Sequence, residues 1–198
     1  MKKVVLILII GILFSCNKKQ NLEKGIHLKP YIISEVDRKL KRNIDSINSV
    51  SENKIYLPRK SYYGESNMII DKKGEIYYYQ KRYFKIFCEY GMEKDTLPEF
   101  LDLQPKDLIK IPKESLKSFI DENVMSKEER RQVLVMASQN DTINSNAFLK
   151  FLNDMRVPTY IIRRTTQEED TVLHYKKTKI YYYSDSIKWD KTKIKLRN

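Results

Sequence analysis

The sequence predicts one domain of the α+β class over residues 31–198, and three patterns support this expectation. Apolar residues first recur at helical spacing, later segments have the composition of strands, and a helical pattern lies between two strands near the centre. A helix that joins two strands in this way is usually a right-handed crossover between parallel neighbours. We therefore expect an N-terminal helix, antiparallel strands, a central βαβ unit and a C-terminal β-hairpin, packed as a two-layer sandwich.

The first element expected is an amphipathic helix after Pro30. Its apolar positions recur at steps of three and four residues and are Ile33, Val36, Leu40, Ile44 and Ile47. Ser34 is the expected N-cap, because a serine oxygen can accept a backbone N–H of the first turn.

Strands are expected next, since β-branched and aromatic residues become frequent. The expected strands are Ile55-Tyr56-Leu57, Met68-Ile69-Ile70 and Glu75 to Phe87. Asp71-Lys72-Lys73-Gly74 has the composition of a tight turn between the second strand and the third. Prolines interrupt any pattern from Asp95 to Pro112, and no regular structure is expected there.

The centre of the chain carries the βαβ pattern. A short helix is expected after Pro112, and the run Val133-Leu134-Val135-Met136-Ala137 suits a strand that is buried on both faces. A helix from Ala147 to Met155 and the strand Thr159-Tyr160-Ile161-Ile162 complete the unit.

The C-terminal part is expected to form a β-hairpin. Thr171 to Tyr175 and Lys179 to Tyr183 are rich in residues that favour strands, and Lys176-Lys177-Thr178 would be the turn between them. The preceding acidic run, Glu168-Glu169-Asp170, is interpreted as a solvated turn.

The first fifteen residues have the three parts of a secretory signal peptide. Lysines at positions 2 and 3 are followed by an uncharged apolar run, and the small residue Ser15 precedes Cys16. The apolar run reaches about half of the ~20 residues that a membrane-spanning helix needs. Leu13-Phe14-Ser15-Cys16 resembles the bacterial lipobox, although Phe14 is larger than the residue usually found there.

The lipobox resemblance implies a bacterial lipoprotein. Residues 1–15 would be removed as a signal peptide, Cys16 would carry acyl chains such as palmitate, and residues 16–30 would form a flexible tether. By the sorting rules of such proteins, Asn17 implies lipid anchoring in the outer membrane, and the lack of an acidic run after Cys16 favours the leaflet that faces the periplasm.

Composition argues against several functions. The net charge of +12 at pH 7 is spread along the chain, which favours an acidic glycan or an envelope protein as partner over nucleic acid. Cys88 and His174 could act as nucleophile and base, but a cysteine between apolar and charged neighbours is more often a core residue. No metal ion or cofactor is expected, because no ligand cluster or phosphate-binding loop is present in the sequence.

The sequence contains five matches to the pattern Asp, then Ser or Thr, then an apolar residue. This pattern resembles the periplasmic O-glycosylation site of one lineage of Gram-negative bacteria. Aspartates that bond their own backbone at turns would explain some of the matches instead. The candidate O-glycosylation residues are Ser46, Thr96, Thr142, Thr171 and Ser186.

From residue 112 to residue 164, the order helix, buried strand, polar loop, helix and strand resembles the periplasmic domain of the ExbD/TolR biopolymer-transport family. The residues that carry the resemblance are Val133 to Ala137, Asp141, Phe148 to Met155, Ile161-Ile162 and Thr165-Thr166. The resemblance implies a partner-binding domain, as a homodimer or an adaptor, without the family's proton-carrying transmembrane helix.

These patterns favour a lipid-anchored periplasmic binding or scaffold protein over an enzyme. Two alternatives are kept. An envelope-acting hydrolase would need two acidic side chains that share a deep pocket and have shifted titration. An immunity lipoprotein that neutralises a toxin would need an exposed patch for a single tight partner.

Overall fold

The computed structural model describes residues 28–53, 55, 64–81 and 97–196. The predicted signal peptide, Cys16 and most of the predicted tether lie outside these ranges, as do Tyr56, Leu57 and Cys88. Ile55 is described and does not belong to a strand, so this part of the expected first strand is wrong. No helix among the described residues is long and apolar enough to span a membrane.

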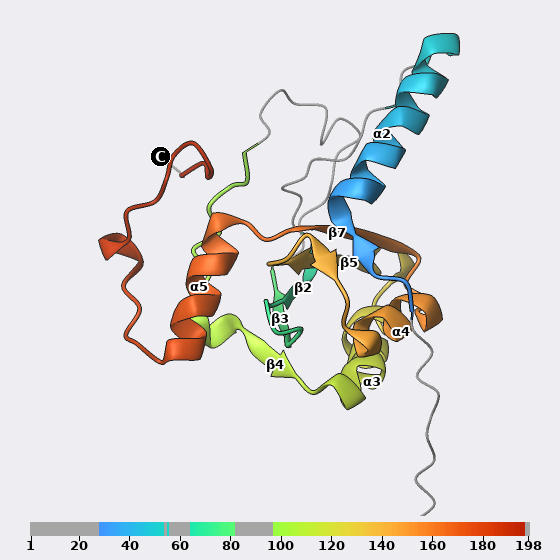
Figure 1. Ribbon diagram of the computed structural model, residues 1–198. Coiled ribbons are helices and arrows are strands. Elements are labelled where there is room, and N and C mark those ends of the chain that lie inside the picture. Colours follow the sequence, from blue (N-terminus) through green and yellow to red (C-terminus); the bar gives the residue numbers. More distant parts are fainter. Residues whose placement is uncertain (1–27, 54, 56–63, 82–96, 197–198) are drawn as a thin grey trace, which may run out of the picture.

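A five-stranded mixed sheet forms the centre of the fold (Figure 1). The strands are β2 (Ser66–Ile70), β3 (Ile76–Gln80), β4 (Ile109–Ile111), β5 (Val133–Ser138) and β7 (Thr159–Arg164). Their order is β4-β3-β2-β5-β7, in which β3 is antiparallel to β2 and β4, while β5 is parallel to β2 and β7. A separate ladder pairs β1 (Tyr31–Ile32) with β6 (Thr142–Ile143). Strand β4 lies where no regular structure was expected.

The described residues also form four α-helices. They are α2 (Ile33–Val50), α3 (Leu116–Ile120), α4 (Asn146–Asp154) and α5 (Gln167–Thr178). Helix α3 continues into a π-helical turn, and the short 3₁₀ turns are Pro105–Asp107, Lys113–Ser115, Glu129–Arg131 and Ser184–Ser186. Helix α4 joins the parallel neighbours β5 and β7, as the expected βαβ unit requires. The α+β class is therefore confirmed.

The sheet buries apolar side chains on both faces. Met68 and Ile70 of β2 pack with Phe148 of α4, whereas Ile69 points to the opposite face and packs with Val172 of α5. Figure 1 shows α5 on one side of the sheet and α3 and α4 on the other. The expected two-layer sandwich is thus wrong, because α5 adds a third layer.

The expected C-terminal hairpin is wrong, because Thr171 to Tyr175 lies within α5. The Thr166 hydroxyl accepts the Glu169 N–H at 3.2 Å and the Glu169 carboxylate accepts the Thr166 N–H at 2.8 Å, which is a capping box at the helix start. The helix ends at Lys179, whose left-handed backbone has a φ of 56°. Capping at both ends, together with burial of one helix face, outweighs the strand preference of the individual residues.

The same helix overturns the interpretation of Glu168-Glu169-Asp170 as a solvated turn. These residues form the first turn of α5, and Glu168 and Glu169 are fully buried. Residues 180–183 are not in a strand either. Asp71 to Gly74, in contrast, forms the expected turn, in which the Gly74 N–H donates to the Asp71 carbonyl at 3.0 Å.

The N-terminal helix is capped by another part of the chain. The expected N-cap, Ser34, lies inside α2, and the Asp141 carboxylate accepts both its N–H at 3.0 Å and its hydroxyl at 2.6 Å. The Asp141 carbonyl accepts the Ile33 N–H at 3.0 Å. Hydrogen bonding from the Ser34 hydroxyl holds the pKa of Asp141 below its usual value. Asp141 therefore fastens α2 to the loop between β5 and α4.

Replacing Asp141 with alanine should lower the thermal unfolding midpoint by a few degrees, because the first turn of α2 loses its cap. Circular dichroism during heating measures the effect. Asp45→Ala, at an exposed position of the same helix, is the matched control and should leave the midpoint unchanged. Equal midpoints for the two variants would show that the Asp141 bonds do not stabilise the helix.

Candidate functional site

The structure does not bring the sequence-predicted site residues together. Ser46 is exposed on α2, Thr142 on β6 and Ser186 on a 3₁₀ turn, so these three hydroxyl-bearing residues lie at the surface on separate elements. Thr171 is partly buried in α5 and its hydroxyl donates to the Gln167 carbonyl at 2.8 Å. Cys16 and Thr96 lie outside the described residues.

Cys88, the candidate nucleophile, lies outside the described residues. His174 lies on the exposed side of α5 rather than in a strand. Its ring contacts that of Tyr175 edge to face, with centroids 5.7 Å apart. It lies in the opposite layer from α3 and α4.

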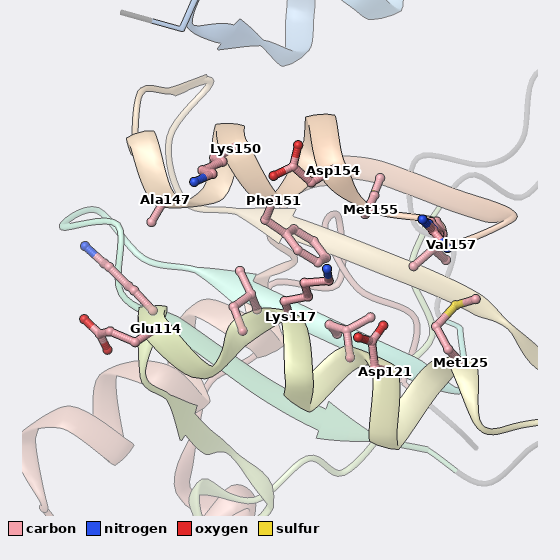
Figure 2. A pocket seen from close by; sticks show the side chains of 14 residues that line it. Glu114, Lys117, Asp121, Met125, Ala147, Lys150, Phe151, Asp154, Met155 and Val157 are labelled. Atoms are coloured by element: carbon pink, nitrogen blue, oxygen red, sulfur yellow. The ribbon is translucent and has the colours of Figure 1, made fainter. Parts of the chain in front are cut away.

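A groove of about 500 Å³ lies between α3, with its π-helical continuation, and α4 (Figure 2). Its floor is formed by Leu116 and Ile120 from the first helix and Phe151 from the second, and all three are buried. Both helices pack on the same face of the sheet through these apolar residues. The groove therefore lies beside the larger of the two apolar clusters.

The rim of the groove carries charged side chains beside apolar ones. Figure 2 shows Glu114 and Lys150 toward one end and Met125 and Val157 toward the other. The charged lining residues are Lys113, Glu114, Lys117, Asp121, Lys150, Asp154 and Arg156. Because both signs are present, the rim suits an occupant that also carries both signs.

The lining of the groove combines apolar and charged side chains. It contains no serine, cysteine or histidine, and its carboxylates are those of Glu114, Asp121 and Asp154. Methionines such as Met125 and Met155 are flexible and polarisable and can adapt to an apolar partner. Among the described residues, no group of three or more His, Cys, Asp or Glu side chains could hold a metal ion.

A second cluster consists of buried charges between the sheet and α5. The guanidinium of Arg163 donates to both oxygens of the Glu169 carboxylate, at 2.7 and 2.8 Å, and the Tyr79 hydroxyl donates to it at 2.6 Å. Burial acts to raise the pKa of Glu169, but the charge and hydrogen bonds of Arg163 hold it below the usual value. The carboxylate is thus ionised and fully bonded inside the protein.

Glu168, the preceding residue in the same helical turn, has a different environment. Its carboxylate accepts the Leu101 N–H at 2.8 Å and the Leu103 N–H at 2.7 Å. These two bonds fasten residues 101–103 to α5. Burial raises the pKa of Glu168 to about 7, although the two backbone N–H groups act to lower it. Glu168 and Glu169 are both fully buried and bonded to the protein itself. They therefore do not favour the hydrolase alternative, whose acid and base must reach a substrate.

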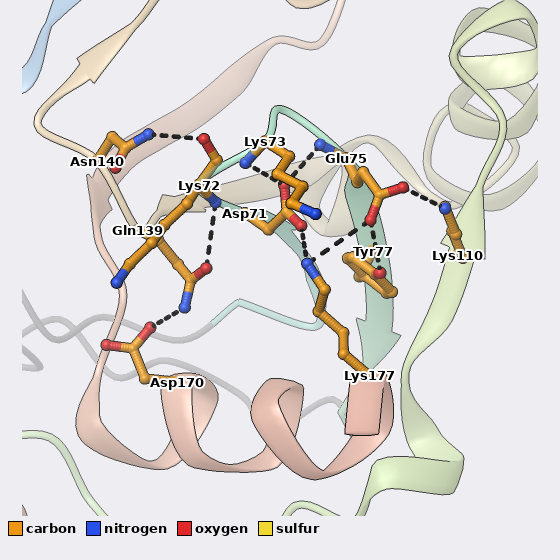
Figure 3. Close-up of polar contacts among 10 residues, drawn as sticks. All are labelled: Asp71, Lys72, Lys73, Glu75, Tyr77, Lys110, Gln139, Asn140, Asp170 and Lys177. Carbon is orange, nitrogen blue, oxygen red and sulfur yellow. Dashed lines mark hydrogen bonds and ion pairs between the residues drawn. The ribbon is translucent and has the colours of Figure 1, made fainter. Parts of the chain in front are cut away.

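A third polar cluster lies where β2 and β5 end (Figure 3). The Asp71 carboxylate accepts the N–H groups of Lys73 and Glu75, at 2.8 and 2.7 Å, and forms an ion pair with Lys177 of α5. The Gln139 amide donates to Asp170 of α5 at 2.8 Å. The carboxyl ends of parallel strands often form ligand sites. Here the polar side chains at these ends hydrogen-bond to one another and to α5, and so fix α5 to the sheet.

Comparison of the chain with protein-family models, with curated proteins and with solved structures gives no match. Function is therefore inferred from the geometry of the chain's own residues.

Sequence reasoning missed the groove and both buried glutamates. The spacing Thr166 to Glu169 matches the capping-box pattern and could have indicated the start of α5. No local signal could have identified the groove, because its two walls are separated in the sequence by strand β5.

Proposed function

We propose that this chain is a lipid-anchored periplasmic binding protein whose α3–α4 groove holds an amphipathic helical segment of another envelope protein. The observation that carries the proposal is the apolar floor between two helices, bordered by side chains of both charges. A helix with one apolar face fits such a groove, and its polar face can pair with the rim.

The position of the groove also supports the finer proposal of an ExbD/TolR-like domain without the proton-coupling helix. All lining residues fall between positions 113 and 157, inside the segment that resembles that family. Elements α3, β5, α4 and β7 follow in the order on which the resemblance rests. In this proposal the domain binds a partner and does not couple proton flow.

Anchoring rests on the leader and is tested separately. Cys16→Ala should remove the lipid mass and release the protein from membranes, because two or more acyl chains are needed for stable attachment. Intact-mass measurement and fractionation of wild type and variant read both effects, and the same spectra report sugar on the five sequons. A wild-type protein that is soluble and unmodified would rule out the anchor.

Groove binding can be tested with a photo-crosslinking residue at position 117 in intact cells. We expect one discrete adduct with an envelope protein, because Lys117 lies along the groove. The matched control places the same residue at His174, which is exposed on α5 in the opposite layer, and should give no such adduct.

A variant that fills the groove makes this test specific. Ala147→Phe should lower the adduct yield about tenfold by placing a ring where the partner packs, as expected for a central interface contact, whereas Ala147→Ser should not. Adducts that persist in Ala147→Phe, or that form equally at position 174, would contradict binding in this groove.

A further inference from the structure

Helix α2 presents an apolar face that the described body of the protein does not cover. The helix has 18 residues, and Ile33 is its one buried residue. Val36, Leu40 and Ile47 are 40–46% exposed, and Val50 is 87% exposed. Figure 1 shows α2 projecting away from the sheet and from the other helices. Such a face has no role in the core.

The apolar residues of α2 follow a heptad pattern. Ile33, Leu40 and Ile47 are seven residues apart and take the first core position, called a. Val36, Asn43 and Val50 are also seven residues apart and take the second core position, called d. Ile33 is already buried in the protein's own core, so the free part of the seam runs from Val36 to Val50, with one polar residue near its middle.

We propose that α2 pairs with α2 of a second copy of this chain as a parallel, in-register coiled coil. This pairing adds a dimer to the proposed function. Its strength depends on the proposed lipid anchor, which would hold both copies in one membrane. It buries the apolar seam described above against the same seam of the second copy.

Asn43 favours the parallel arrangement. In register, its amide lies opposite the amide of Asn43 in the second copy, and each group can donate and accept one hydrogen bond. An antiparallel pair that uses the same seam would place Asn43 opposite Leu40 and leave a polar group among apolar side chains. The polar position therefore selects both direction and register.

The residues beside the seam agree with this arrangement. In a parallel pair, Lys39 at position g lies beside Ile44 at position e of the second copy. The aliphatic part of the lysine can cover the isoleucine while its charge stays in water. Charged residues such as Arg38 and Arg42 lie on the outer side of the helix, so no like charges meet across the seam.

The tether gives a further reason for parallel pairing. The helix begins at Ile33, and only the two residues of β1 separate it from the predicted tether, so a parallel pair places both tethers at one end. Two copies held in one membrane would then reach each other without bending the chain. An 18-residue helix pairs weakly in dilute solution, but confinement on a surface raises its effective concentration.

Cysteine cross-linking of the full-length protein in its own membranes tests the proposal, in a Cys88→Ser background. Leu40→Cys should form at least about ten times more disulfide dimer than Arg38→Cys, because position 40 faces its copy and position 38 points away. Coexpressed Val36→Cys and Ile47→Cys variants should give little mixed dimer, because only antiparallel pairing brings these positions together. Similar yields at 40 and 38, or mixed dimers that exceed the dimer at 40, would overturn the proposal.

Three further variants separate this proposal from others. If Cys16→Ala is as membrane-bound as wild type, the lipid anchor is wrong, whereas the cross-link at position 40 still reports on pairing. If no position cross-links and Leu40→Asp releases the protein from vesicles, the face of α2 binds lipid and the pairing proposal is wrong. Asn43→Leu should raise the yield of mixed 36–47 dimer, since the polar position no longer selects the direction.

Discussion

Replacing Arg163 with methionine should lower the free energy of unfolding by about 3–5 kcal/mol, because the Glu169 carboxylate would remain buried without its cation. The two side chains are 3% and 1% exposed, and their charged atoms are 2.7 Å apart. Methionine keeps much of the volume of arginine, so the loss reports on charge rather than on a cavity. Urea unfolding at neutral pH measures the change.

An exposed ion pair in the same protein provides the control. Arg130 lies 2.8 Å from Glu128, but their side chains are 71% and 61% exposed. Arg130→Met should change the free energy of unfolding by less than about 1 kcal/mol, since water screens such pairs. Combining Arg163→Met with Glu169→Gln should recover part of the loss. A change below about 1 kcal/mol for Arg163→Met alone would mean that the buried carboxylate is not left unpaired.

The second large effect expected is a dependence of stability on pH that originates at Glu168. Burial raises its folded-state pKa from 4.5 to about 7, so between these values the folded protein binds more protons than the unfolded chain. Stability from this group is therefore fully present below pH 4.5 and is lost as the pH rises through 7. The difference corresponds to about 3 kcal/mol.

Glu168→Gln should remove this dependence, because an amide does not titrate. Urea midpoints of wild type and variant, measured from pH 5 to pH 8, should diverge as the pH rises, with the variant losing less stability. Glu114→Gln, at an exposed position of the groove, should keep the wild-type profile. Parallel profiles for wild type and Glu168→Gln would show that the Glu168 carboxyl titrates alike in the folded and unfolded states.

The sequence predicted those elements whose patterns are local and strong. The apolar run of β5, the helical spacing of α4 and the turn that ends at Gly74 depend on neighbouring residues, and the structure confirms them. The prediction of a C-terminal hairpin is wrong, because the residues of α5 favour strands individually whereas the capping box at Thr166 starts a helix. Partners distant in the sequence also decided the outcome, since Glu168 bonds Leu101 and Leu103.

The candidate sites also differ in whether a local motif could predict them. Cys16 and the five sequons could be proposed from short motifs, because each motif lies within a few residues. The groove required knowledge of how α3 packs beside α4, which depends on the whole sheet. Asp141 illustrates the difference, because it was selected as part of a sequon and its carboxylate serves as the cap of α2.

Strand β2 pairs with β3 through a short turn but meets β5 only after a long stretch of chain. The hairpin can therefore form well before the parallel half of the sheet. Until β5 arrives, one edge of β2 leaves its N–H and C=O groups unpaired beside Met68 and Ile69, and such edges associate between molecules. If the chain is exported unfolded with its N-terminus first, aggregation would be most probable before Val133–Ser138 emerges, and a chaperone that shields strand edges would act at that stage.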